Sequence, residues 1–131
     1  MPKSVLPFLM FQGEGAAALD FYLLVFPGAV AEDVVRYDET GPGPAGTLRM
    51  ARLKLADQTI LLNDSPIRHA FTFTPSVSMF VECGSADEVR QLGDALKEGG
   101  AELMPAANYG FSSFFTWVSD RFGVSWQINL A

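Results

Sequence analysis

Residues 8–29 read FLMFQGEGAAALDFYLLVFPGA, and this stretch decides the fold. Its first four residues end an apolar run over residues 5–11, and a run of this kind is typical of a strand. After Gly13 the apolar side chains recur at helical spacing, until Pro27 and Gly28 end the pattern. The buried side of this helix is predicted to hold Ala18, Leu19, Tyr22, Val25 and Phe26. The chain therefore starts as a strand followed by an amphipathic helix.

Three more strands are predicted after this helix, over residues 30–37, 47–55 and 59–63. A loop rich in glycine and proline, residues 40–46, separates the first two. In the second of these strands Leu48 and Leu53 are both apolar although their parities differ. That strand must either bulge or bury both of its faces.

The second half of the chain repeats this order of elements. Ser85 followed by Glu88 forms a capping box, which predicts the start of a second helix. Val89, Leu92 and Leu96 form its buried stripe. Strands are predicted over residues 76–83, 101–104, 112–119 and 123–130, the last two joined by a tight turn. Strand, helix and three strands therefore occur twice.

Composition limits the kinds of partner. The 131 residues carry a net charge of −6, which repels the phosphates of nucleic acid. The apolar run over residues 5–11 is too short to span a membrane, so neither nucleic acid nor membrane is an expected partner. One cysteine, Cys83, cannot form an internal disulfide, and with no export signal the expected compartment is the cytoplasm. Because His69 is the single histidine, the chain cannot form a metal site built on several of its own imidazoles.

Residues 8–29, the loop 41–46 and the stretch WVSDRFGVSWQI at 117–128 resemble the PhnB-like, demethylubiquinone-methyltransferase-like branch of the vicinal oxygen chelate superfamily. The resemblance implies an α+β fold in which two βαβββ modules form a curved, mostly antiparallel sheet around a cavity. The whole chain, 1–131, would be one such domain, with module one at about 1–65, a connector at 66–75 and module two at about 76–131. It also implies a homodimer.

In metal-dependent relatives, four inward side chains from the first and last strand of each module hold the ion. The resemblance places these positions on Pro7, Leu61, Ser76 and Gln127. Only Gln127 could ligate, and moving the second position to Asn63 adds one more weak neutral oxygen. We therefore expect no metal and no cofactor.

Alternation along the strands selects the residues that line the cavity. If Ser119 pairs with Val124 across the turn, then Phe114 and Thr116 share the face of Gln127, and both tryptophans lie in the core. Tyr109-Gly110-Phe111 is either a lip over the cavity or a plain loop. The predicted ligand-binding residues are Leu9, Asn63, Ser76, Ser78, Tyr109, Phe111, Phe114, Thr116 and Gln127.

These residues support two hypotheses of function. The first is a metal-free protein that binds a small, partly apolar or cationic molecule, as the antibiotic-sequestering members of the superfamily do. The alternative is a lyase or isomerase of the glyoxalase type, which uses either an unidentified metal site or acid–base chemistry through His69 or Asp64. A plainer interpretation makes His69 a loop residue, Asp64 a turn residue, and the protein a dimeric scaffold with no catalytic task.

Overall fold

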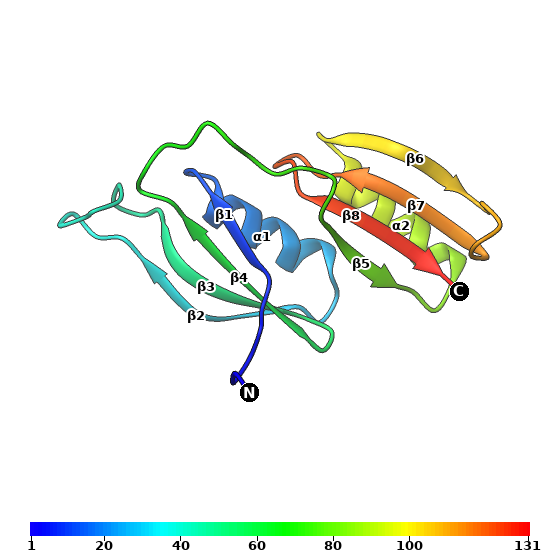
Figure 1. Cartoon of the computed structure of the whole chain (residues 1–131), viewed down its shortest axis with the longest axis horizontal. Coiled ribbons are helices and arrows are strands. Elements are labelled where there is room, and N and C mark those ends of the chain that lie inside the picture. The colour runs from blue at the N-terminus through cyan, green and yellow to red at the C-terminus, as the bar shows by residue number, and fades with distance from the viewer. The chain divides into compact units, whose positions relative to one another are not determined.

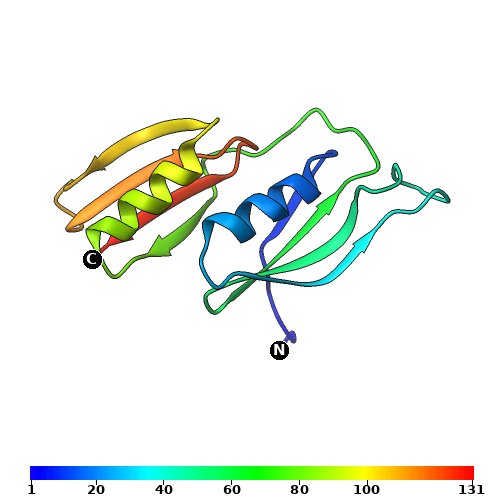
Figure 2. The same ribbon diagram turned by 180° about the vertical axis from the view of Figure 1, so that it is seen from behind.

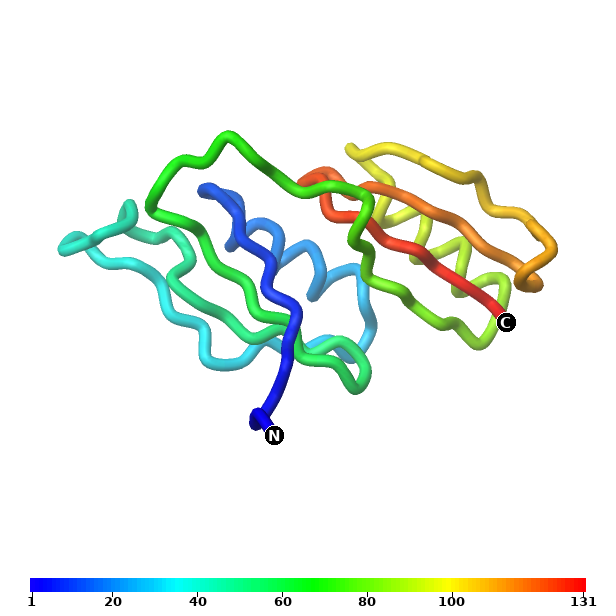
Figure 3. Tube along the Cα trace, in the orientation of Figure 1, coloured from blue at the N-terminus to red at the C-terminus, as the bar shows by residue number.

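The computed structural model describes all residues from 1 to 131 and divides them into two compact units, Met1–Ala70 and Phe71–Ala131. Each unit contains one helix and one four-stranded sheet (Figure 1). Figure 3 traces the chain from the first unit through the segment that follows residue 64 into the second. Neither helix has the length and the apolar run that crossing a bilayer requires.

The two units share one topology. Unit 1 consists of β1 (Phe8–Phe11), α1 (Gly15–Val25), β2 (Val30–Arg36), β3 (Leu48–Leu55) and β4 (Gln58–Asp64). Unit 2 consists of β5 (Ser78–Glu82), α2 (Ala86–Lys97), β6 (Ala101–Ala107), β7 (Phe114–Ser119) and β8 (Ser125–Leu130). The strand orders are β1-β4-β3-β2 and β5-β8-β7-β6, with the first pair parallel and the other two antiparallel. The α+β fold with two βαβββ modules is confirmed, and each module has its own mixed sheet.

Each helix covers one face of the sheet in its own unit, as Figure 2 shows from behind. In unit 1 the predicted helix positions Ala18, Leu19 and Tyr22 are buried. They face apolar side chains of β3 and β4, namely Ala51, Leu53, Ile60 and Leu62. A register shift in the β2–β3 ladder brings Leu48 into the core as well, so of the two alternatives left open for β3 the bulge is present.

The start of α1 depends on a residue far along the chain. The Glu14 side chain does not cap the helix. Instead Asp64 Oδ1 accepts hydrogen bonds of 2.8 Å from the backbone N–H groups of Gly13 and Gly15, and its Oδ2 accepts one of 2.8 Å from Leu48. A carboxylate at this position also faces the positive end of the helix dipole. Asp64 therefore joins β4, β3 and the N-terminus of α1.

In unit 2 the predicted cap and stripe are both confirmed. Ser85 Oγ accepts from the backbone N–H of Glu88, and the Glu88 carboxylate accepts from the N–H of Gly84. Val89, Leu92 and Leu96 are buried. Local signals were sufficient here because the cap and the stripe lie within a dozen residues of each other.

The hairpin between β7 and β8 differs from the prediction by one residue. Ser119 pairs with Ser125, not with Val124. The buried carboxylate of Asp120 causes this register, because its Oδ1 accepts from the N–H groups of Phe122 and Val124 and extends the loop to five residues. Its Oδ2 accepts from the Trp126 indole N–H at 2.9 Å.

Candidate functional site

The candidate site is the sheet face of unit 2 that lies opposite α2, which we call the open face. Side chains from β5, β8 and β7 alternate between α2 and this face. The members of the open face are Ser78, Phe80, Glu82, Phe115, Trp117, Ser119, Ser125, Gln127 and Asn129. They combine neutral polar groups and one carboxylate with aromatic rings, and small-molecule sites commonly hold such groups.

Four polar side chains of the open face form a connected network. The hydroxyls of Ser78 and Ser125 lie 2.6 Å apart. The Trp117 indole N–H donates to Ser125 Oγ at 2.8 Å, and Gln127 Nε2 donates to Ser78 Oγ at 3.2 Å. Because the amide nitrogen of Gln127 is directed to Ser78, its carbonyl oxygen is available to accept a hydrogen bond from a ligand.

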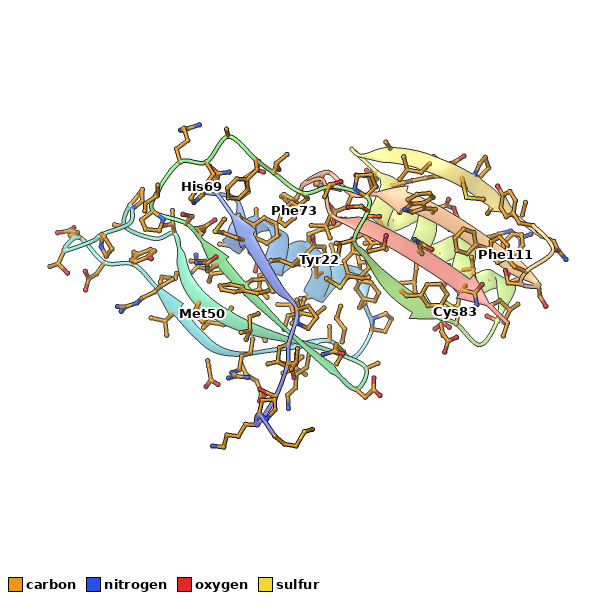
Figure 4. All side chains as sticks on the ribbon, viewed as in Figure 1. Tyr22, Met50, His69, Phe73, Cys83 and Phe111 are labelled. Carbon is orange, nitrogen blue, oxygen red and sulfur yellow. The ribbon has the colours of Figure 1, made fainter.

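Aromatic rings lie beside this network. The Phe111 ring meets the Phe115 ring edge to face with centroids 5.0 Å apart, and Tyr109 meets Phe115 in the same manner at 6.1 Å. Figure 4 shows Phe111 near the C-terminal end of β8. Phe111 is 65% exposed and Phe80 is 56% exposed, so both rings present apolar surface to solvent. Such rings can stack on a flat ligand.

The structure corrects three of the predicted ligand-binding residues in unit 2. Because of the shifted hairpin register, Phe114 and Thr116 lie on the side of α2, where Arg90 stands 4.6 Å over the Phe114 ring. Ser76 lies in the turn before β5 and is exposed. The open face does include Ser78 and Gln127, and Tyr109 and Phe111 pack on its member Phe115.

In unit 1 the prediction for Leu9 was wrong, and Asn63 remains a candidate. Leu9 pairs with Leu62 and is only 8% exposed, because it faces α1 and not the open side of its sheet. Asn63 pairs with Met10 on the side away from α1, and its buried Oδ1 has no hydrogen-bond partner.

The two candidate acid–base residues are tied into local structure. Asp64 is 2% exposed, and three backbone N–H groups bond to its carboxylate. His69 Nε2 lies 3.0 Å from Ser65 Oγ, and the backbone N–H of His69 donates to the Gln12 side chain. The Ser65 hydroxyl in turn bonds to the backbone of Ile67. This arrangement stabilises the segment after β4.

A pocket of about 170 Å³ lies in unit 1, between the turn after β1, the loop before β3 and the segment after β4. Its polar lining includes Gln12, Thr47, Asp64, Ser65 and Arg68. Sites for drug-sized ligands usually enclose roughly 300–1,000 Å³. The pocket is smaller than that range.

The residues at the superfamily's metal positions do not fit a metal ion. Pro7 precedes β1, and its carbonyl oxygen accepts from the Leu61 N–H. Leu61 offers no donor atom, and Ser76 lies outside β5. Gln127 supplies one neutral amide oxygen, and the structure contains no cluster of three His, Cys, Asp or Glu side chains that could hold a metal. Divalent ions need more, and stronger, ligands than this set offers.

Cys83 should react slowly. Burial of its thiol, together with the charge of Glu88, raises its pKa to about 11. The thiolate is the reactive form, and the raised pKa lowers the fraction of thiolate at pH 8. A thiolate of higher pKa is more nucleophilic, which offsets part of this decrease. We therefore expect alkylation by iodoacetamide at pH 8 to be about tenfold slower than for an ordinary cysteine. Mass spectrometry over time measures the rate, which should rise steadily up to about pH 11. Reaction at pH 8 as fast as that of glutathione would contradict the assignment.

The sequence analysis missed several members of the open face. Trp117 was placed in the core because the hairpin register was taken one residue too short, whereas its indole N–H lies in the polar network. Phe115 changed face for the same reason. A signal was available, since an aspartate directly before a turn often bonds to backbone N–H groups two or more residues onward, as Asp120 does.

Two modules of strand, helix and three strands are the architecture expected of the vicinal oxygen chelate superfamily, the class of protein that the sequence resembles. A domain of that class, the glyoxylase/bleomycin resistance protein/dioxygenase domain from Frankia sp., shares the fold at a TM-score of 0.69 and 14% identity, covering 100% of this chain and 93% of its own. The chain belongs to the 3-demethylubiquinone-9 3-methyltransferase family, whose model matches residues 3–129.

Two solved structures are similar over nearly the whole chain. The PhnB protein from Bacillus cereus is 40% identical, with a TM-score of 0.94, and the match covers 98% of this chain and 100% of that one. Protein PA1353 from Pseudomonas aeruginosa is 26% identical, with a TM-score of 0.85 and 98% of each chain covered. No curated protein matches the sequence. The chain is thus a PhnB-like member of the superfamily.

Proposed function

We propose that this protein binds a small, partly apolar molecule on the open face of unit 2, without a metal ion. The observation that carries the proposal is the network of Ser78, Ser125, Trp117 and Gln127 beside exposed aromatic rings. Apolar surface supplies most of the affinity in such sites, and a few fixed polar groups orient the ligand. The homodimer and the cytoplasmic location remain predictions.

The network is suited to orientation because its own geometry is fixed. Ser125 is 1% exposed, and both of its neighbours, Ser78 and Trp117, bond to its hydroxyl. Ser78 and Gln127 are half-buried and so remain within reach of a bound molecule. A preorganised polar group loses little entropy when the ligand binds.

The test uses 2-(2-naphthyl)ethanol, a flat apolar ring with one hydroxyl. We expect millimolar binding, with ¹H–¹⁵N chemical-shift changes concentrated at the Trp117 indole and the Gln127 side-chain amide. Gln127→Ala should weaken binding by roughly threefold to tenfold, the effect of one hydrogen bond.

The matched control is Gln91→Ala, which removes an exposed glutamine on α2 of the same unit. It should leave both the affinity and the pattern of shifts unchanged. Shifts that cluster away from the open face, equal weakening by both variants, or no binding at 5 mM probe would each overturn the proposal.

A further inference from the structure

The open face carries one charged side chain, Glu82, on the strand next to the buried amide of Asn129. β5 and β8 pair in parallel, with Glu82 opposite Asn129 and Phe80 opposite Gln127. Residues paired in this way point to the same face of the sheet. Glu82 is exposed, and no ion pair of the structure includes it. Glu82 and Asn129 are therefore cross-strand neighbours on this face, and the carboxylate of Glu82 forms no ion pair.

The side-chain carbonyl oxygen of Asn129 accepts no hydrogen bond. The side chain is only 8% exposed, and its buried Oδ1 has no partner. Buried acceptors without a partner are uncommon in folded proteins, because losing water without gaining a protein donor is unfavourable. A ligand that brings an N–H group to this oxygen would remove that penalty.

Aromatic rings surround the same point. Phe115 lies opposite Asn129 on β7, and Phe111 packs against Phe115 at 5.0 Å. The Tyr109 hydroxyl donates to the Pro105 carbonyl oxygen, which fixes that ring, whereas Phe111 is 65% exposed. Phe111 is thus an exposed ring that contacts the cross-strand neighbour of Asn129. The faces of aromatic rings also attract cations.

We propose that the open face takes a flat aromatic ring that carries a primary ammonium group. The ammonium donates to Asn129 Oδ1 and faces the Glu82 carboxylate, while the ring lies against Phe80 and Phe111. This inference rests on the proposed function, because it specifies the ligand of the same face. The net charge of −6 favours the approach of a cation.

The test compares two probes that differ in one group, 2-(2-naphthyl)ethylamine and 2-(2-naphthyl)ethanol, by ¹H–¹⁵N titration at pH 7. We expect the amine to bind about tenfold more tightly than the alcohol and to shift the Asn129 side-chain amide signals. Glu82→Gln and Asn129→Leu should each reduce this preference to less than threefold, because one removes the charge and the other the acceptor.

Glu98→Gln is the matched control, since it removes an exposed carboxylate at the C-terminal end of α2 and should keep the full preference. Equal affinities for amine and alcohol would overturn this inference and leave the proposed function standing. Loss of the preference in the Glu98→Gln variant would also overturn it, because the effect would then be a general one of net charge. If neither probe binds, the proposed function itself fails.

Discussion

Asp64→Ala is expected to reduce the free energy of unfolding by about 3–5 kcal/mol, because it leaves three backbone N–H groups without their acceptor. These donors belong to Gly13, Gly15 and Leu48, and the latter two bonds are buried. The loss should be concentrated in unit 1, where the carboxylate joins β4 to β3 and to α1. Urea unfolding followed by far-UV circular dichroism measures it.

Two further variants make the result specific. Asp64→Asn keeps an oxygen for Gly13 and Gly15 but sets an amide N–H against that of Leu48, so we expect an intermediate loss of about 1–3 kcal/mol. Asp20→Ala removes an exposed carboxylate on α1 and should change stability by less than about 0.5 kcal/mol. A loss below 1 kcal/mol for Asp64→Ala would show that the three N–H groups find other acceptors.

Gly100→Ala is expected to cost roughly 2–4 kcal/mol, because a methyl group at this position has no room. A Cβ built on Gly100 would lie 2.0 Å from the Ser119 carbonyl oxygen and 2.6 Å from the carbonyl carbon of Asp120. Both contacts are with backbone, which cannot yield as the end of a side chain does. Urea unfolding followed by tryptophan fluorescence is a suitable measurement, since Trp117 and Trp126 both lie in unit 2.

Gly84→Ala supplies the control for this steric effect. Gly84 precedes α2, and nothing lies within 4 Å of a Cβ placed there. Its N–H bond to Glu88 does not involve the side chain, so the variant should remain within about 0.5 kcal/mol of the parent or become slightly more stable. If both glycine variants unfold at the same urea concentration, the contact with Ser119 is relieved by a small backbone shift and the steric argument is wrong.

The sequence predicted the elements well where the signal was local. The cap at Ser85 and the stripe of Val89, Leu92 and Leu96 lie within one helix, and each was found where it was expected. The bulge in β3 was one of two alternatives left open by the apolar pattern around Leu48. Periodicity detects such features because the residues concerned are neighbours in the chain.

The candidate site was harder to predict because it depends on register. A shift of one residue in a hairpin moves every side chain of a strand to the other face, and Phe114 and Thr116 were misplaced in this way. The role of Asp64 was also inaccessible, since its hydrogen-bond partners Gly13 and Gly15 lie about fifty positions earlier in the chain. Only the folded arrangement brings these atoms together.

The parallel pairing of β1 with β4, the first and last strands of unit 1, also sets an order of folding. Phe8 of β1 pairs with Leu61 of β4, so the first strand cannot close its sheet until the last strand of unit 1 exists. The turns between β2, β3 and β4 close much shorter loops and lose less chain entropy. During synthesis on the ribosome, the apolar segment over residues 8–11 therefore stays unpaired until about fifty further residues have been synthesised. A chaperone that holds extended apolar segments would find its target in that interval.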